Sequence, residues 1–121
     1  MAKSILVVDD DPDVVKVLEA RLRASGYDVI TAGDGIEAMI KMLKATPDLA
    51  LLDITMPGLD GAELSQVMKN GKETRGIPII FITGLRKPQE QAQEGTQIAG
   101  HRIFAKPFDS KELLAAIAEM I

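Results

Sequence analysis

Ile5-Leu6-Val7-Val8-Asp9-Asp10 and Leu49-Ala50-Leu51-Leu52-Asp53 are the two stretches that decide the fold of this chain. In each of them a short apolar run ends on carboxylates. Short apolar runs bounded by turn-forming residues are typical of strands that are buried on both faces of a parallel sheet. The carboxyl ends of such strands line the crevice in which α/β proteins bind ligands. Three carboxylates in one crevice would repel one another unless a cation lay between them, so these strand ends predict a hard-metal site.

Outward from these two strands, apolar runs alternate with amphipathic helical patterns. The predicted strands cover residues 4–8, 27–31, 48–53, 77–82 and 101–105, and the predicted helices begin near Pro12, after Asp34, at Ala62, at Gln89 and after Asp109 or Ser110. This alternation predicts a flavodoxin-like, doubly wound α/β fold with a five-stranded parallel sheet and helices on both faces. The strand order 2-1-3-4-5 suits a chain of this length, and it places the strand ending at Asp9 beside the strand ending at Asp53.

Four of the five predicted helices carry apolar stripes, which we expect to face the core. The stripes are Val14, Val17, Leu18 and Leu22; Ile36, Met39, Ile40 and Leu43; Leu64, Val67 and Met68; and Leu113, Leu114, Ile117, Met120 and Ile121. The remaining helix, predicted over 89–96, is rich in Gln and Glu and has few apolar anchors. We expect it to be the weakest of the five.

Composition narrows the class of protein. The 121 residues fit one domain, predicted over 1–121, and the net charge of −4 argues against direct nucleic-acid binding, which needs a basic surface. The absence of Cys excludes a disulfide framework and a thiolate metal site. The apolar patch near the N-terminus is too short for a signal peptide or a membrane span. We therefore expect a soluble, cytoplasmic domain that contacts no membrane.

Chemically useful side chains recur at the predicted carboxyl ends of the strands: Asp9, Asp10, Asp53, Thr83 and Lys106. Taken singly, each has an ordinary explanation, since aspartate often caps helices or turns and lysine is usually a surface residue. Together they supply metal ligands, a hydroxyl and an ammonium, which are the groups that neutralise the anionic oxygens of a phosphoryl group. A strand-end aspartate can also act as a nucleophile.

The chain resembles the receiver domain of two-component response regulators over essentially its whole length. Four segments carry the likeness: Val-Val-Asp-Asp-Asp at 7–11, Leu-Asp-Ile-Thr-Met-Pro-Gly-Leu-Asp-Gly at 52–61, Thr-Gly at 83–84 and Lys-Pro-Phe at 106–108. They occur in the family's order and at compatible separations. The Asp-x-x-Met-Pro-x-x-Asp-Gly pattern is the most specific of them.

The resemblance implies a phosphoacceptor and a metal site. Asp53 would accept a phosphoryl group from a phosphohistidine, carried by a sensor histidine kinase or a phosphotransfer protein. Asp10, Asp53 and the backbone carbonyl of Thr55 would hold Mg²⁺, and Asp9 would help to position the metal. The expected activity is limited to self-phosphorylation and autodephosphorylation, so the resemblance does not imply a classical enzyme.

The resemblance also implies a readout. Lys106 would pair with the phosphoryl oxygens, and the hydroxyl of Thr83 would move to the phosphate and report its presence. The altered surface would regulate a downstream effector protein or domain. The apolar residues of the last predicted helix would in addition allow a homodimer.

One position departs from the family pattern. Many receivers carry Tyr or Phe three residues before the lysine, whereas this chain has Ile103 there and Phe104 one residue later. Adjacent residues of a strand face opposite sides, so Phe104 cannot simply replace an aromatic residue at 103. Either this protein switches without an aromatic side chain at that position, or strand 101–105 has a shifted register.

Two other functions compete with this interpretation. A small Mg²⁺-dependent phosphohydrolase would carry a second carboxylate two positions after its nucleophile, and this chain has Thr55 there. A binding module could keep the fold and signal without phosphate. The complete acidic site argues against that module, whereas Ile103 and the weak helix over 89–96 favour it slightly.

Overall fold

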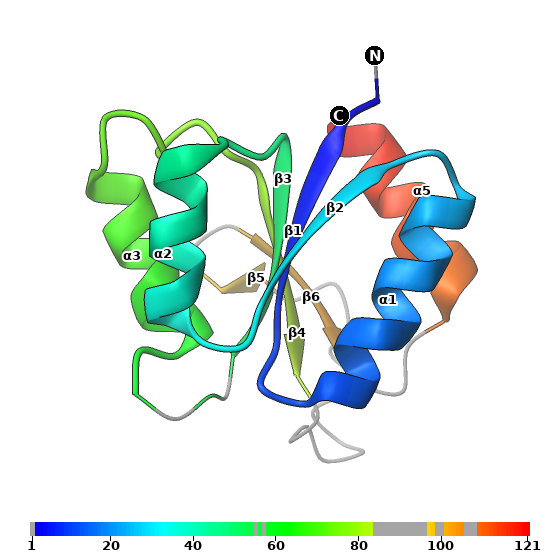
Figure 1. Ribbon diagram of the computed structural model, residues 1–121, viewed down its shortest axis with the longest axis horizontal. Coiled ribbons are helices and arrows are strands. Elements are labelled where there is room, and N and C mark those ends of the chain that lie inside the picture. The colour runs from blue at the N-terminus through cyan, green and yellow to red at the C-terminus, as the bar shows by residue number, and fades with distance from the viewer. Residues whose placement is uncertain (1, 55, 57, 84–96, 99–100, 106–108) are drawn as a thin grey trace.

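A six-stranded sheet forms the middle layer of the protein, and helices cover both of its faces (Figure 1). The computed structural model describes residues 2–54, 56, 58–83, 97–98, 101–105 and 109–121. Helices α1 (Pro12–Ala24) and α5 (Ser110–Met120) lie on one face, and α2 (Gly35–Lys44) and α3 (Gly61–Asn70) lie on the other. The predicted helix over 89–96 lies outside the described residues. No helix in the described part of the chain is long and apolar enough to span a membrane.

The parallel strands have the predicted order. They are β1 (Ser4–Val8), β2 (Asp28–Ala32), β3 (Leu49–Asp53), β4 (Ile79–Thr83) and β6 (His101–Ala105), arranged as β2-β1-β3-β4-β6. Counted along the chain without β5, this is the order 2-1-3-4-5, so the predicted fold class is confirmed. The sequence did not predict β5 (Gln97–Ile98), which pairs antiparallel with β6 at the sheet edge. Two residues are too few to show a strand periodicity.

Aspartate side chains begin the helices. Asp11, Asp34, Asp60 and Asp109 are the N-caps of α1, α2, α3 and α5. Each carboxylate accepts a hydrogen bond of 2.7–3.0 Å from a backbone N–H of the first helical turn. Three of these caps agree with the predicted helix starts near Pro12, after Asp34 and after Asp109 or Ser110. In the structure Asp60 forms a capping box with Glu63, so α3 begins one residue earlier than predicted.

Two apolar clusters lie on either side of the sheet. Leu6 and Val8 of β1 belong to the cluster beneath α2 and α3, whereas Ile5 and Val7 belong to the cluster beneath α1 and α5. All five residues of β3 and all five of β4 are buried. The prediction of strands buried on both faces is therefore confirmed, and the carboxylates at the ends of β1 and β3 are attached to buried strands.

The helical stripes are only partly buried, so the prediction that they face the core was wrong at five positions. On α2, Ile36, Ile40 and Leu43 are 61%, 51% and 66% exposed. Val17 of α1 and Val67 of α3 are 53% and 38% exposed. The remaining stripe residues are buried or half-buried.

Small residues explain the orientation of α2. The helix buries Gly35, Ala38 and Met42 instead of its largest aliphatic side chains. A Cβ atom on Gly35 would lie 2.5 Å from the carbonyl oxygen of Leu59, so the helix approaches the loop before α3 more closely than a larger residue would allow. Apart from the side that carries Glu37, Lys41 and Lys44, α2 is apolar, so its periodicity alone cannot show which part of this broad apolar face is buried.

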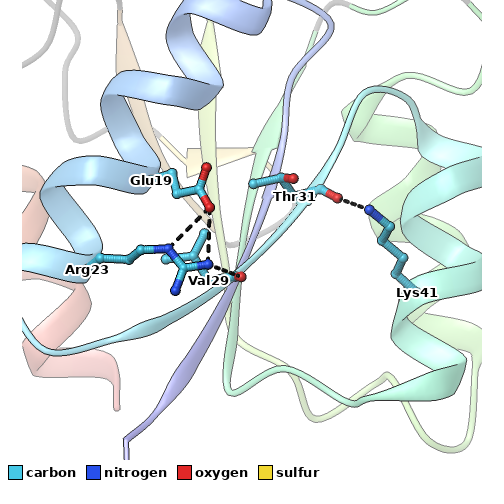
Figure 2. A network of polar contacts seen from close by, with 5 residues as sticks. All are labelled: Glu19, Arg23, Val29, Thr31 and Lys41. Atoms are coloured by element: carbon cyan, nitrogen blue, oxygen red, sulfur yellow. Dashed lines mark hydrogen bonds and ion pairs between the residues drawn. The ribbon is translucent and has the colours of Figure 1, made fainter.

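Basic side chains cover the outer edge of β2 (Figure 2). Arg23 of α1 donates a hydrogen bond of 3.2 Å to the carbonyl oxygen of Val29, and Lys41 of α2 donates one of 2.5 Å to that of Thr31. An edge strand presents every second carbonyl away from its neighbour, where it could pair with another chain. The two basic residues satisfy these carbonyls from the two faces of the sheet.

Candidate metal centre

The ends of β1 and β3 bring three carboxylates together. Val8 pairs with Leu52 in the parallel register, so the residues that follow them, Asp9 and Asp53, reach the same point of the sheet edge. One carboxylate oxygen from each of Asp9, Asp10 and Asp53 lies within 4.8 Å of the others. The sequence predicted this meeting from the strand ends and the strand order.

The three carboxylates differ in exposure. Asp9 and Asp53 are only 1% and 3% exposed, whereas Asp10 is exposed. The backbone N–H of Asp9 bonds the carbonyl oxygen of Ala32 at 3.2 Å, and its Oδ1 accepts a bond of 2.9 Å from the N–H of Asp11. Asp9 is therefore fixed by the first turn before α1, and Asp10 faces solvent beside it.

The first residue of α3 fixes the backbone that carries Asp53. Gly61 donates a hydrogen bond of 3.1 Å to the carbonyl oxygen of Ile54. A Cβ atom on Gly61 would lie only 2.2 Å from the carbonyl oxygen of Asp53. The sequence did not predict this contact. The one hint in the sequence was a glycine directly after an aspartate that can cap a helix. Glycine does not favour helix formation, so its presence there suggests a close contact.

Thr83 is the last residue of β4, and the strand pairing places it close to this site. Ile82 pairs with Asp53, so Thr83 lies one residue beyond the strand partner of Asp53, and it is 3% exposed. Thr83 itself pairs with Ala105, the residue that precedes Lys106 in the chain. Lys106 and Thr55, both predicted as site residues, lie outside the described residues.

A cavity of about 240 Å³ adjoins the acidic cluster. Asp9 and Asp10 line it together with Pro12, Val15, Lys16, Thr31, Ala32, Gly33 and Glu37. The Oε1 atom of Glu37 accepts a hydrogen bond of 2.7 Å from the N–H of Gly33, and its Oε2 atom pairs with Lys41 at 3.1 Å. The Gly33 bond, followed by Lys41, lowers the pKa of Glu37 below its ordinary value. Glu37 therefore adds negative charge to the lining of this cavity.

The donor chemistry of the cluster fits a hard divalent cation. The side chains of Asp9, Asp10 and Asp53 offer only carboxylate oxygens. Mg²⁺ and Ca²⁺ prefer oxygen ligands, whereas softer metals prefer sulfur or imidazole nitrogen. Two of the three carboxylates are buried and held by the sheet, while the exposed Asp10 leaves an entry from solvent. These residues can hold a small oxygen-preferring ion without rearrangement of the strands.

The strand that carries Ile103 has a regular register. Phe81 pairs with Ile103 and Ile82 pairs with Phe104 in an uninterrupted parallel ladder that ends at Thr83 and Ala105. Ile103 lies in the cluster beneath α2 and α3, and Phe104 lies in the opposite cluster. The register of β6 is therefore not shifted, and Phe104 stays on the other face. The strand pairing favours the alternative in which this protein switches without an aromatic side chain at position 103.

The class of protein is defined by a doubly wound parallel sheet that carries a cluster of three carboxylates at its carboxyl edge. The chain belongs to the response regulator receiver domain family, and the model of that family matches residues 5–118. Receiver domains are signalling domains of two-component systems that work with histidine kinases, and they are not classical enzymes.

Relatives of known name support this assignment. The DNA-binding dual master transcriptional regulator RpaA of Synechocystis is 33% identical over 117 residues, which cover 97% of this chain and 48% of RpaA. The chain spans about half the length of RpaA and of the similar transcriptional regulators that it matches.

Solved structures agree in fold. The chemotaxis protein CheY4 of Vibrio cholerae superposes with a TM-score of 0.84 at 27% identity, and the match covers 100% of both chains. The response regulator TrrA of Thermotoga maritima, solved in complex with Mg²⁺-BeF, gives a TM-score of 0.80 at 31% identity over 98% of this chain and 99% of TrrA. A relative with the same fold has thus been solved with Mg²⁺.

Proposed function

We propose that this chain is a phosphoacceptor, in which Asp53 takes a phosphoryl group from a phosphohistidine of a sensor histidine kinase or phosphotransfer protein. The observation that carries this proposal is the meeting of Asp9, Asp10 and Asp53 within 4.8 Å at the carboxyl edge of the sheet. The phosphorylated surface then regulates a downstream effector protein or domain. The extent of the domain, 1–121, and its cytoplasmic location stay predictions from the sequence.

The transfer step needs few groups. A carboxylate oxygen of Asp53 attacks phosphorus, the P–N bond of the phosphohistidine breaks, and its electron pair returns to the imidazole nitrogen, which takes up a proton. The product is an acyl phosphate on Asp53. Aspartate carboxylates ordinarily carry no proton at neutral pH, so this attack requires no general base. Burial of Asp53 at the end of β3 fixes the direction of its side chain.

The metal site belongs to the same proposal. Asp10 and Asp53, with the backbone carbonyl of Thr55, would hold Mg²⁺, and Asp9 would help to position it. When bound, Mg²⁺ supplies positive charge that reduces the repulsion between an anionic nucleophile and an anionic donor. The all-oxygen donor set and the Mg²⁺-BeF complex of TrrA support this assignment.

Two further residues complete the proposed site. Lys106 pairs with the phosphoryl oxygens, and the hydroxyl of Thr83 approaches the phosphate once it is attached. The strand register supports both roles, because Thr83 and Ala105 are paired at the same edge of the sheet and Lys106 is the next residue in the chain. The buried position of Ile103 favours a readout in which no aromatic side chain moves at that point of β6.

Phosphorylation can be tested with a small phosphodonor. Incubation with Mg²⁺ and acetyl phosphate or phosphoramidate is expected to add one phosphoryl group, seen by intact-protein mass spectrometry, and Asp53→Asn is expected to abolish it. Asp28→Asn is the matched control, because Asp28 is an exposed carboxylate at the opposite end of the sheet. An unmodified wild-type mass would overturn the proposal and favour a module that signals without phosphate.

A further inference from the structure

One face of α2 exposes large aliphatic side chains. Ile36, Ile40 and Leu43 follow the spacing i, i+4, i+7, which places them in one row along the helix. They are 61%, 51% and 66% exposed, and they make up three of the five large apolar side chains that are exposed in the described part of the chain. A row of this kind is typical of a helix face that packs against another helix.

The fold does not need this face for its own core. The opposite face of α2 already packs into the cluster beneath it through Ala38 and Met42. Val67 of α3, the other helix on this face of the sheet, is 38% exposed. The exposed row of α2 is therefore available to another molecule.

The last helix is a poorer candidate for the homodimer that the sequence suggested. Its large aliphatic residues Leu113 and Ile117 are buried in the cluster shared with α1, and Leu114 and Met120 are half-buried against it. Among the described residues of α5, no large apolar side chain is exposed. The apolar residues of α5 serve the core, and the exposed ones lie on α2.

We propose that the exposed face of α2 is a self-association surface that packs antiparallel against the same face of a second copy of this chain. A two-fold axis near Ile40 would bring Ile40 against the partner's Ile40 and would place Ile36 close to the partner's Leu43. Isologous pairing about a two-fold axis is the commonest form of homo-oligomer, and it makes each apolar side chain of the row face another. This inference does not rest on the proposed phosphorylation.

The charges along α2 favour this orientation. Glu37 lies in the first turn and Lys44 in the last, so an antiparallel pair brings Glu37 close to the partner's Lys44 at both ends of the contact. Antiparallel helices also oppose their dipoles favourably. The antiparallel orientation therefore places opposite charges at both ends of the contact.

The size of the face sets the strength of the contact. Stable interfaces bury about 800 Å² on each partner, and one helical row of three aliphatic side chains is well below that area. We therefore expect a weak and reversible dimer, with a dissociation constant in the range of about 100 μM to about 1 mM. Such a dimer forms when copies are held at high local concentration.

NMR dilution tests the proposal on the protein as it stands. Backbone amide shifts of the ¹⁵N-labelled chain, compared between about 1 mM and about 20 μM, are expected to change mainly over 35–44 and at Val67. Ile40→Glu places two negative charges at the two-fold axis and is expected to lower the association constant at least about tenfold. Val17→Glu, on a residue of similar exposure in α1, should leave it unchanged and is the matched control.

A second variant separates association from folding. Lys44→Glu lies on an exposed residue at the end of α2, and it should weaken the dimer because Glu37 would then face a like charge. Asp53→Asn should associate as the wild type does, so failure of phosphorylation and failure of association can be told apart. Shifts centred on α1 or α5, a spectrum that does not change with concentration, or unchanged association in both Ile40→Glu and Lys44→Glu would each overturn the proposal.

Discussion

The carboxyl ends of β1 and β3 and the outer edge of β2 both concentrate charged side chains, but they arrange them differently. At the first region three carboxylates of like charge lie within 4.8 Å of one another. At the second, each cation is paired with an anion, Arg23 with Glu19 and Lys41 with Glu37, both at 3.1 Å, while each also bonds a strand carbonyl. Like charges held together are typical of a site built for a ligand, whereas matched charges are typical of a structural contact.

The two regions also differ in how their backbone is held in place. Gly61 allows α3 to abut the carbonyl of Asp53, which fixes the acidic site through close packing. The β2 edge is held by long, partly exposed side chains that can move. Changes at the acidic site should therefore have large effects on position and binding, and changes at the β2 edge should have small effects on stability.

The largest effect is expected from Gly61→Ala. The added Cβ would overlap the Asp53 carbonyl, so the backbone must move and the unfolding free energy should fall by about 3 kcal/mol. Phosphorylation should decline with it, because the nucleophile is displaced. Gly76→Ala is the control, since a Cβ there meets nothing within 4 Å and no positive φ is involved. Urea unfolding of both variants gives the comparison, and equal stability of the two would contradict a packing role for Gly61.

Mg²⁺ should stabilise the folded chain through the carboxylates at the ends of β1 and β3, without any effect on the outer edge of β2. A cation that binds only the folded chain adds about 1.4 kcal/mol at a concentration ten times its dissociation constant, or about 5 °C in Tm. Asp10→Ala should lose most of this shift, whereas Asp28→Ala should keep it. Thermal unfolding with and without Mg²⁺ measures the effect. An undiminished shift in Asp10→Ala would place the ion elsewhere.

The sequence predicted the acidic region more completely than the β2 edge or α2. Apolar runs that end on aspartate, together with strand order, are enough to place Asp9 beside Asp53. The contact of Gly61 could not be predicted, because it depends on the distance between two segments that meet only in the folded chain. Likewise, no local pattern shows that Arg23 reaches the carbonyl of Val29.

The hydrophobic periodicity did not predict which face of α2 is buried. Helix α2 has a broad apolar face, so Ile36, Ile40 and Leu43 looked as suitable for the core as Ala38 and Met42. Gly35 on the buried face permits a close approach to Leu59 in the loop before α3, which a hydrophobicity pattern does not predict. For Ile103, in contrast, strand alternation predicted that Phe104 faces the other way, and the paired register agrees.

A smaller effect is expected when the β2 edge loses a cation. Lys41→Met removes a donor to the carbonyl of Thr31 and the ion pair with Glu37, so the unfolding free energy should fall by about 1 kcal/mol. Lys44→Met, on an exposed lysine one turn further along α2, should change it by less than about 0.5 kcal/mol. Urea unfolding at low protein concentration measures both. A loss as large as that of Gly61→Ala would remove the distinction between the two regions.

The smallest effect concerns the pH dependence of Glu37, which belongs to both regions because it pairs with Lys41 and also lines the cavity beside Asp10. Its pKa is lowered in the folded chain, first by the N–H of Gly33 and then by Lys41. The ionised carboxylate therefore contributes stability that is fully present above the ordinary pKa of glutamate and is lost as the pH falls through the lowered value. Glu37→Gln should flatten the stability curve in that acid range by a few tenths of a kcal/mol, about the size of an exposed i,i+4 pair. Urea midpoints measured at a series of pH values decide this, and parallel curves for the wild type and Glu37→Gln would mean that the Gly33 and Lys41 contacts do not persist in solution.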